Sequence, residues 1–203
     1  MSLSLAGRRV VVVGGGRVAT RRVADLVAVS ADVVVVALEL TADLEKRVAA
    51  GQIAALRRPF EPGDLDGAWL AFTATADLAV DRAVVAAAGE RRCWVSSAQG
   101  GAGASCAPMS VLRRGDLHVA VGTSGRSPAL AGWLRRRLES QVGPEYGVLL
   151  DLAAEARQDL SGSGAGGDGY NWYRAFDSGI LDLIRAGRVS EAREGLRTCL
   201  SSS

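Results

Sequence analysis

A glycine-rich stretch near the start of the chain is the first candidate for chemistry. It reads VVVVGGGRVA, and its candidate ligand-binding residues are Gly14, Gly15 and Gly16, which Arg17 and Val18 follow. The spacing from Gly14 through Gly16 to Ala19 is that of a GxGxxA fingerprint. Its first glycine permits a tight turn, its second lets the backbone approach a pyrophosphate, and its small third residue lets a helix pack closely on a strand. The stretch therefore predicts a dinucleotide site at a helix N-terminus, and a tight turn without a ligand is the alternative.

An acidic residue about 20 positions after such a fingerprint binds the adenosine ribose in many dinucleotide sites. Glu39, which follows Leu38 at the end of the run VVVVAL, fits this position. A carboxylate that binds both ribose hydroxyls disfavours a 2′-phosphate. The sequence therefore predicts NAD as cofactor rather than NADP.

Small residues end another apolar run, at Thr73-Ala74-Thr75-Ala76-Asp77. Ligands of doubly wound sheets lie beyond the carboxyl ends of the strands, so Ala74 and Thr75 are expected to let a cofactor lie close. The alternative is a plain strand end with Asp77 capping the following helix. Both interpretations can hold at once.

The stretch GTSGRSP, residues 122–128, is a second candidate site. Its candidate substrate-binding residues are Thr123, Ser124, Gly125, Arg126 and Ser127. Glycines, hydroxyls and an arginine before a helix start suit an anion, so a substrate carboxylate is expected to dock here. A capped loop without a ligand is the alternative, with Ser127 as N-cap and Pro128 as the first helical residue.

Arginine clusters at residues 113–114 and 135–137 also suit a polycarboxylate, because guanidinium pairs with carboxylate through two parallel hydrogen bonds. Solvated helix faces would give the same clusters.

His118, the only histidine, lies inside the apolar run DLHVAV. We interpret it as a packed structural residue rather than a catalyst.

The three cysteines, Cys93, Cys106 and Cys199, lack the short spacing of a zinc or redox site. Buried or idle reduced thiols are expected, and no metal site is predicted.

Alternating elements between about residues 8 and 98 would position the first group of candidates. Strands are expected over residues 8–14, 31–38, 54–60, 68–75 and 93–98, and helices over residues 17–29, 41–51 and 77–92. Strands and helices in alternation, with short connections, predict an α/β fold: a doubly wound, Rossmann-type parallel sheet covered on both faces.

The pattern changes after that point. The stretch QGGAGASCAP, residues 99–108, is too glycine-rich for a regular element and marks a domain edge or an open loop. A strand over residues 116–124 and helices over 127–140 and 144–160 are expected next. The stretch SGSGAGGDG, residues 161–169, has the composition of a flexible tether, and the tail beyond it predicts two short amphipathic helices joined near Gly187.

Composition limits the class of protein. With 203 residues, 48% of them hydrophobic and 23% charged, the chain suits one globular domain, either alone or with a small helical appendage. No apolar run reaches the roughly 18 residues of a membrane helix, and a net charge of +2 does not indicate nucleic-acid binding. The start, MSLSLAGRRV, lacks the features of a signal peptide, so a cytoplasmic location is expected.

Four stretches together resemble the precorrin-2 dehydrogenase and sirohydrochlorin ferrochelatase family of siroheme synthesis. They are VVVVGGGRVATRRVADL, RPFEPGDLDGAWLAFTATAD, APMSVLRRGDLHVAVGTSGRSPALAGWLRRRLE and GILDLIRAGRVSEAREGL, and they span nearly the whole chain in the family's order. The resemblance implies an NAD-binding domain over residues 1–110, a dimerisation and substrate-loop region over 111–145 and a helical C-terminal domain over 146–203. It also implies a homodimer that oxidises precorrin-2, a tetrapyrrole polycarboxylate, to sirohydrochlorin with NAD, and some members insert ferrous iron.

The same resemblance implies roles for the candidates already named. Cofactor contacts are expected at Arg17, Val18, Leu38 and Glu39 and around Ala74 and Thr75. Thr123 matches a hydroxyl of the family's substrate cleft, with residues 124–127 beside it.

One position departs from the family. Its aspartate after the strand CWVSSA is replaced by Gln99, or by Ala98 if the gap is placed differently, and no acidic residue occurs between Arg91 and Arg113. Glutamine neither accepts a proton as a carboxylate does nor binds ferrous iron well, so ferrochelatase activity is doubtful. The catalytic residue is therefore unknown. A non-catalytic NAD- and tetrapyrrole-binding carrier or regulator is the main alternative, and a nucleotide-sensing module of ion transporters is a third.

Overall fold

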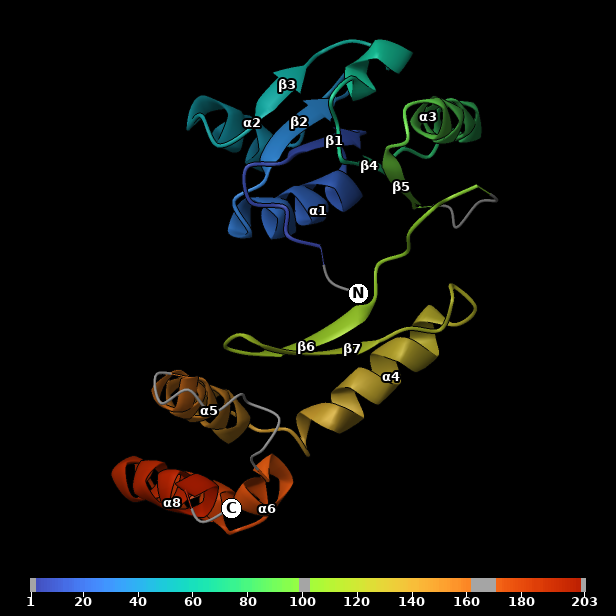
Figure 1. Cartoon of the computed structure of the whole chain (residues 1–203). Coiled ribbons are helices and arrows are strands. Elements are labelled where there is room, and N and C mark those ends of the chain that lie inside the picture. The colour runs from blue at the N-terminus through green and yellow to red at the C-terminus, as the bar shows by residue number, and fades with distance from the viewer. Residues whose placement is uncertain (1–2, 99–102, 162–170, 202–203) are drawn as a thin grey trace. The chain divides into compact units, whose positions relative to one another are not determined.

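The computed structural model describes residues 3–98, 103–161 and 171–201 (Figure 1). The chain divides into two compact units, Met1–Pro108 and Met109–Ser203. Residues 111–145 and 146–203, which the sequence suggested as separate regions, fall together in the second unit.

The first unit is built on a five-stranded sheet in the order β3-β2-β1-β4-β5, with every neighbouring pair parallel. Its strands are β1 (Arg9–Val13), β2 (Asp32–Val36), β3 (Ala54–Leu56), β4 (Leu70–Thr73) and β5 (Trp94–Ser97). Its helices are α1 (Arg17–Ala28), α2 (Ala42–Ala49), the short 3-10 helix η1 (Pro62–Leu65) and α3 (Leu78–Glu90). The doubly wound, Rossmann-type α/β fold is confirmed.

The valine run of β1 explains why helices cover both faces of the sheet. Val10 and Val12 pack in one cluster with α1 and with Leu44 of α2, whereas Val11 and Val13 pack in the other with α3. Alternate residues of a strand point to opposite faces, so four consecutive valines need apolar partners on both sides. Figure 1 shows α1 and α3 on opposite sides of the sheet.

The second unit begins with an antiparallel hairpin, β6 (Ser110–Arg114) and β7 (Leu117–Val121). Its helices are α4 (Pro128–Glu139), α5 (Glu145–Ser161), α6 (Trp172–Phe176), α7 (Ile180–Arg185) and α8 (Val189–Ser201). Residues including Leu152, Ile180, Leu196 and Leu200 form the core of the helical part. Residues 162–169 of the expected tether lie outside the described residues.

Three sequence expectations are corrected. Strand β6 and helix α6 were not expected, and β3 ends at Leu56 rather than Phe60. The hairpin did have a signal, because Gly115 and Asp116 separate two apolar runs and Gly115 has the positive φ of 58° that such turns require. Pro59 has no N–H to donate to a strand ladder, which favours the early end of β3.

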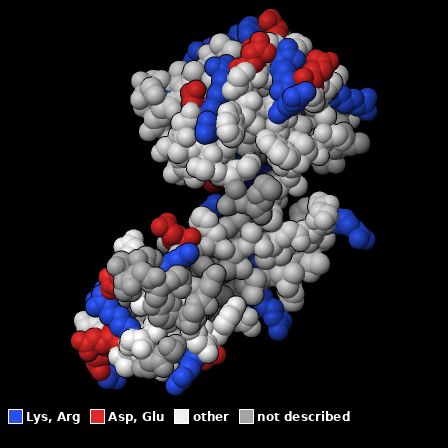
Figure 2. All heavy atoms as spheres, in the orientation of Figure 1, with Lys and Arg blue, Asp and Glu red and all other residues white. Residues whose placement is uncertain are grey.

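Charged side chains are mixed rather than segregated. Figure 2 shows basic and acidic side chains interspersed on the visible face of the first unit. In the second unit, Arg185, Arg193 and Arg197 pair with acidic residues of α5. Within the described part of the chain, no helix is both long and apolar enough to cross a membrane.

Candidate functional site

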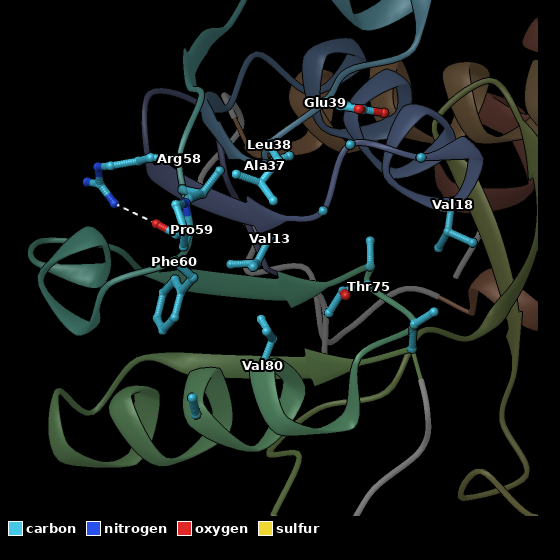
Figure 3. A pocket seen from close by; sticks show the side chains of 18 of the residues that line it. Val13, Val18, Ala37, Leu38, Glu39, Arg58, Pro59, Phe60, Thr75 and Val80 are labelled. Atoms are coloured by element: carbon cyan, nitrogen blue, oxygen red, sulfur yellow. Dashed lines mark hydrogen bonds between the residues drawn. The ribbon is translucent and has the colours of Figure 1, made fainter.

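A pocket of about 830 Å³ lies in the first unit, beyond the ends of β1, β2 and β4 (Figure 3). It is lined by Val13, Gly14, Gly15, Gly16, Arg17, Val18, Val36, Ala37, Leu38, Glu39, Arg58, Pro59, Phe60, Ala74, Thr75, Ala76, Val80, Ala83 and Ala98. The structure therefore brings all nine sequence-predicted cofactor residues to the lining of one pocket. The carboxyl edge of a parallel sheet is where such folds bind ligands.

Backbone packing within the protein requires glycine at positions 14 and 15, independently of any ligand. Gly14 has a φ of 119°, and a Cβ there would overlap the carbonyl group of Ala74. A Cβ on Gly15 would overlap the carbonyl oxygen of Glu39. These two glycines let the loop after β1 lie directly against the segments that follow β4 and β2.

Gly16 is different, because nothing in the described residues lies within 4 Å of where its Cβ would be. It is the N-cap of α1, with an ordinary φ of −85°, and no side chain caps this end of the helix. The first turn of α1 also carries no acidic residue. The positive end of the helix dipole and its N–H groups therefore face open space, which fits a phosphate-bearing cofactor.

Glu39 and Leu38 form another wall. Both are exposed, and Figure 3 shows Glu39 on the loop after β2, close to the start of α1. Two contacts hold this loop in place: the Thr41 N–H donates to the Gly15 carbonyl at 3.0 Å, and the Thr20 and Thr41 hydroxyls lie 2.8 Å apart. Glu39 thus lines the pocket beside the glycine-rich loop after β1.

Sequence reasoning missed the wall that follows β3, formed by Arg58, Pro59 and Phe60. In Figure 3 the Arg58 guanidinium points away from the pocket and donates to the Pro59 carbonyl at 2.9 Å. It also binds both carboxylate oxygens of Asp64, at 3.0 and 2.5 Å. The pattern RPFEPGD carries no ligand-binding signature, so only the tertiary structure reveals this brace.

Asp64 is buried, and burial by itself would raise its pKa. The hydrogen bonds from Arg58 and from the Glu61 N–H, with the positive charges of Arg58 and Arg9, outweigh burial and hold the pKa of Asp64 below its usual value. The brace is therefore a charged pair at neutral pH.

On the opposite side, Ala74, Thr75 and Ala98 line the pocket with Val80 and Ala83 of α3. All are small or apolar. Capping by Asp77 also occurs, because its carboxylate accepts from the Ala79 N–H at 2.7 Å and the Val80 N–H at 3.4 Å. Both interpretations of this strand end are compatible with the structure.

The loop of residues 122–128 is an ordered turn in the second unit. The Arg126 N–H donates to the Thr123 carbonyl at 2.9 Å, and Ser124 and Gly125 between them have positive φ values of 50° and 75°. The Ser127 N–H donates to the Thr123 hydroxyl at 3.2 Å. Capping of α4 by Ser127 is confirmed, because its hydroxyl accepts from the Leu130 N–H at 3.2 Å. Arg126 is exposed.

The arginine clusters divide by their contacts. Arg114 donates to the carbonyls of Glu139 and Val142 at the end of α4, at 3.3 and 2.9 Å, so it fastens that helix to the hairpin. Arg135 pairs with Glu139 one helical turn away. Arg113 is exposed. The polycarboxylate interpretation therefore does not extend to Arg114 or Arg135.

His118 is exposed on β7, opposite Arg113, so the expectation of a packed histidine is wrong for this chain.

The cysteines are free thiols. Burial, with a smaller effect of neighbouring Cys106, raises the pKa of Cys93 to about 11, so it is a neutral thiol at neutral pH. In the described part of the chain, no cluster of three or more His, Cys, Asp or Glu is placed to bind a metal ion. Gln99 lies outside the described residues.

Comparison with known families identifies the first unit. A family profile described as "Putative NAD(P)-binding" matches residues 1–106. The chain belongs to this NAD(P)-binding family. A second profile, described as "Sirohaem biosynthesis protein central", matches residues 114–141, which span the turn of the hairpin, β7 and α4.

Curated relatives of this NAD(P)-binding chain carry the name siroheme synthase. The protein from Methylobacillus flagellatus is 35% identical, and the match covers 98% of this chain and 43% of that protein. Siroheme synthase 1 from Pectobacterium atrosepticum is 32% identical, covering 95% of this chain and 41% of that protein. The chain thus spans less than half the length of these relatives.

A solved structure extends the likeness to both units. SirC, a precorrin-2 dehydrogenase, is 26% identical with a TM-score of 0.73, and the match covers 98% of this chain and 97% of SirC. The fold is therefore that of SirC, and the family resemblance predicted from the sequence is confirmed.

Proposed function

We propose that the protein is an NAD-dependent dehydrogenase that oxidises precorrin-2 to sirohydrochlorin in siroheme or cobalamin synthesis. The open N-terminus of α1 at Gly16, in the wall of the pocket, carries the proposal. The names of the relatives and of SirC support this substrate and reaction.

NAD would be held by this chain's own groups along the carboxyl edge of the sheet. The backbone of Gly14 to Val18 would bind the pyrophosphate, and Glu39 the adenosine ribose, which favours NAD over NADP. Ala74 and Thr75 would leave room for the cofactor on the other side of β1. When bound, NAD accepts the hydride that leaves the tetrapyrrole.

The loop of residues 122–128 would bind a carboxylate of the substrate through Arg126, whose exposed guanidinium can form two parallel hydrogen bonds with it. We expect Arg126→Ala to weaken precorrin-2 binding about 10-fold or more without changing the affinity for NAD. Arg135→Ala is the matched control, because Arg135 already pairs with Glu139. Equal precorrin-2 affinity in wild type and Arg126→Ala would remove the loop from the substrate site.

The decisive experiment incubates the purified protein anaerobically with enzymatically generated precorrin-2 and NAD, while NADH and the sirohydrochlorin spectrum are followed together. We expect both products to appear in equal amounts. NAD and precorrin-2 binding without turnover would refute the dehydrogenase.

Replacement of the family aspartate by Gln99 favours one second candidate, a non-catalytic carrier or regulator that binds NAD and a tetrapyrrole. The same replacement argues against ferrochelatase activity. The variant Gln99→Asp distinguishes the dehydrogenase from the non-catalytic carrier. A wild-type rate as high as the Gln99→Asp rate supports the dehydrogenase, whereas activity that appears only in Gln99→Asp supports the carrier.

A further inference from the structure

Asp81 is a buried acid that the fingerprint does not include. It lies in α3 with only 4% of its surface exposed. Asp64, the other buried acid of the first unit among the described residues, is neutralised by Arg58. The side chains that donate to Asp81 are hydroxyls instead, those of Thr73 and Ser97.

These hydroxyls tie two strand ends to one carboxylate. Thr73, the last residue of β4, donates its hydroxyl hydrogen to Asp81 Oδ1. Ser97, the last residue of β5, lies 3.0 Å from Asp81 Oδ2. The Ala98 N–H donates to the Thr73 hydroxyl oxygen at 3.2 Å. Because an N–H can only donate, this bond leaves the Thr73 hydrogen for Asp81, which fixes the direction of the network.

Burying the polar groups of this hydrogen-bond network costs free energy, so the place where the network lies in the fold is informative. Central parallel strands are usually apolar on both faces, as the valines of β1 and β2 are here. Thr73, at the end of the central strand β4, nevertheless has only 2% of its surface exposed. Burying polar groups is unfavourable unless each finds a partner, and the carboxylate of Asp81 supplies one for Thr73 and Ser97.

Each tied strand end leads directly into the pocket. Ala74 and Thr75 follow Thr73, and Ala98 follows Ser97. Figure 3 shows Thr75 and, from α3, Val80 beside this part of the pocket. With the ribose near Glu39 and the pyrophosphate at Gly16, the other half of a dinucleotide would extend toward β4 and β5.

We propose that Asp81 is a positioning residue for the nicotinamide end of the pocket, acting through Thr73 and Ser97. It holds the ends of β4 and β5 in register so that Ala74, Thr75 and Ala98 set the depth at which the reactive ring lies. This inference rests on the proposed NAD-dependent function.

Paired variants test it. Thr73→Val keeps the shape of the side chain and removes the hydroxyl, whereas Thr73→Ser keeps the hydroxyl. Asp81→Ala and Asp81→Asn form a second pair, in which Asn retains an acceptor oxygen. Val84→Ala is the control for stability, because Val84 lies on α3 itself, is fully buried in the core and is not part of the pocket wall.

Three readouts separate positioning from general stability. In the ligand-free protein, Thr73→Val should accelerate amide hydrogen exchange at Ala98. The fluorescence of bound NADH, which arises from the nicotinamide ring, should change in Thr73→Val and Asp81→Ala but not in Val84→Ala. Per folded molecule, kcat should fall about 10- to 100-fold in these two variants while the NAD affinity stays within about threefold, because small misplacements of reacting groups cost rate. Thr73→Ser and Asp81→Asn should recover most of the loss.

The inference is overturned if Thr73→Val and Asp81→Ala give the wild-type NADH fluorescence and kcat. It is also overturned if Val84→Ala lowers kcat per folded molecule and changes the NADH fluorescence as much as these two variants do. A wild-type protein that binds no NADH would instead refute the proposed function. The two failures are therefore distinct.

Discussion

At the scale of single residues, adjacent glycines serve different purposes. A Cβ on Gly15 would overlap the Glu39 carbonyl oxygen, whereas a Cβ on Gly16 would meet nothing in the protein. We predict that Gly16→Val folds normally but binds NAD at least about 100-fold more weakly, because the added side chain occupies the space of the pyrophosphate. Gly15→Val should lower the unfolding temperature instead.

Calorimetric titration with NAD and thermal unfolding of both variants check this prediction. Unchanged NAD affinity in a well-folded Gly16→Val protein would show that the cofactor does not bind at the start of α1.

Glu39 is predicted to select the cofactor. A carboxylate beside the ribose repels a 2′-phosphate, so wild type should bind NAD more tightly than NADP. We expect Glu39→Ser to shift the ratio of the two dissociation constants toward NADP by about 10-fold or more, corresponding to at least about 1.4 kcal/mol. Glu45→Ser is the control, because Glu45 lies on α2, pairs with Arg57 and does not line the pocket. A wild-type protein that prefers NADP would contradict the role of Glu39.

The sequence predicted nine of the residues that line the pocket. The glycines came from a fingerprint that combines residue type with spacing along the chain, and the others came from the strand ends and the family resemblance. Arg58 and Asp81 lack such a signature. Their partners, Asp64 and the ends of β4 and β5, become informative only once folding brings them together. Side chains that shape a pocket from behind are therefore harder to find in a sequence than those that line it.

At the scale of elements, the Arg58 and Asp64 pair braces the turn from β3 to η1 and so shapes one wall of the pocket. We predict that Asp64→Asn lowers the unfolding free energy of the first unit by about 1 to 2 kcal/mol at neutral pH, since it weakens charge-assisted hydrogen bonds to a partly exposed arginine.

This stabilisation should depend on pH. The pKa of Asp64 is lower in the folded protein than in the unfolded chain, where it is near 4. The contribution is then fully present above about pH 5 and is lost as the pH falls below about 4, through the folded pKa. Urea unfolding, followed by NMR signals of the β1 valines, should show wild type and Asp64→Asn converging in acid. A constant difference down to about pH 2 would contradict the charged brace.

The sequence predicted the helices and strands correctly where the apolar pattern extended over many residues. Valine runs gave β1 and β2, and the alternation of strand and helix gave the parallel sheet. The hairpin strand β6 was missed because the arginines at its end suggested a charged cluster, although Leu112 packs inward. Helix α6 was missed because its five residues are too few to show a period.

At the scale of the whole molecule, the second unit is expected to make a homodimer, as the family resemblance implies. Leu130 and Trp133 of α4 and Met109 before β6 are about half exposed, at 48%, 49% and 48%. Leu130 and Trp133 are three positions apart and so lie on one face of α4, and large apolar side chains exposed together mark an interaction surface. A second copy of the chain is the occupant that we propose for it.

Sedimentation equilibrium should therefore give twice the 21.0 kDa of one chain. Trp133→Arg should shift the mass toward that of a single chain, because burying an unpaired guanidinium at the centre of an apolar contact is unfavourable. Tyr173→Arg is the matched control: Tyr173 is a more exposed aromatic residue of the same unit, at 84%, and lies on α6. A wild-type protein of single-chain mass would refute the dimer, and equal dissociation by both variants would place the contact elsewhere in the second unit.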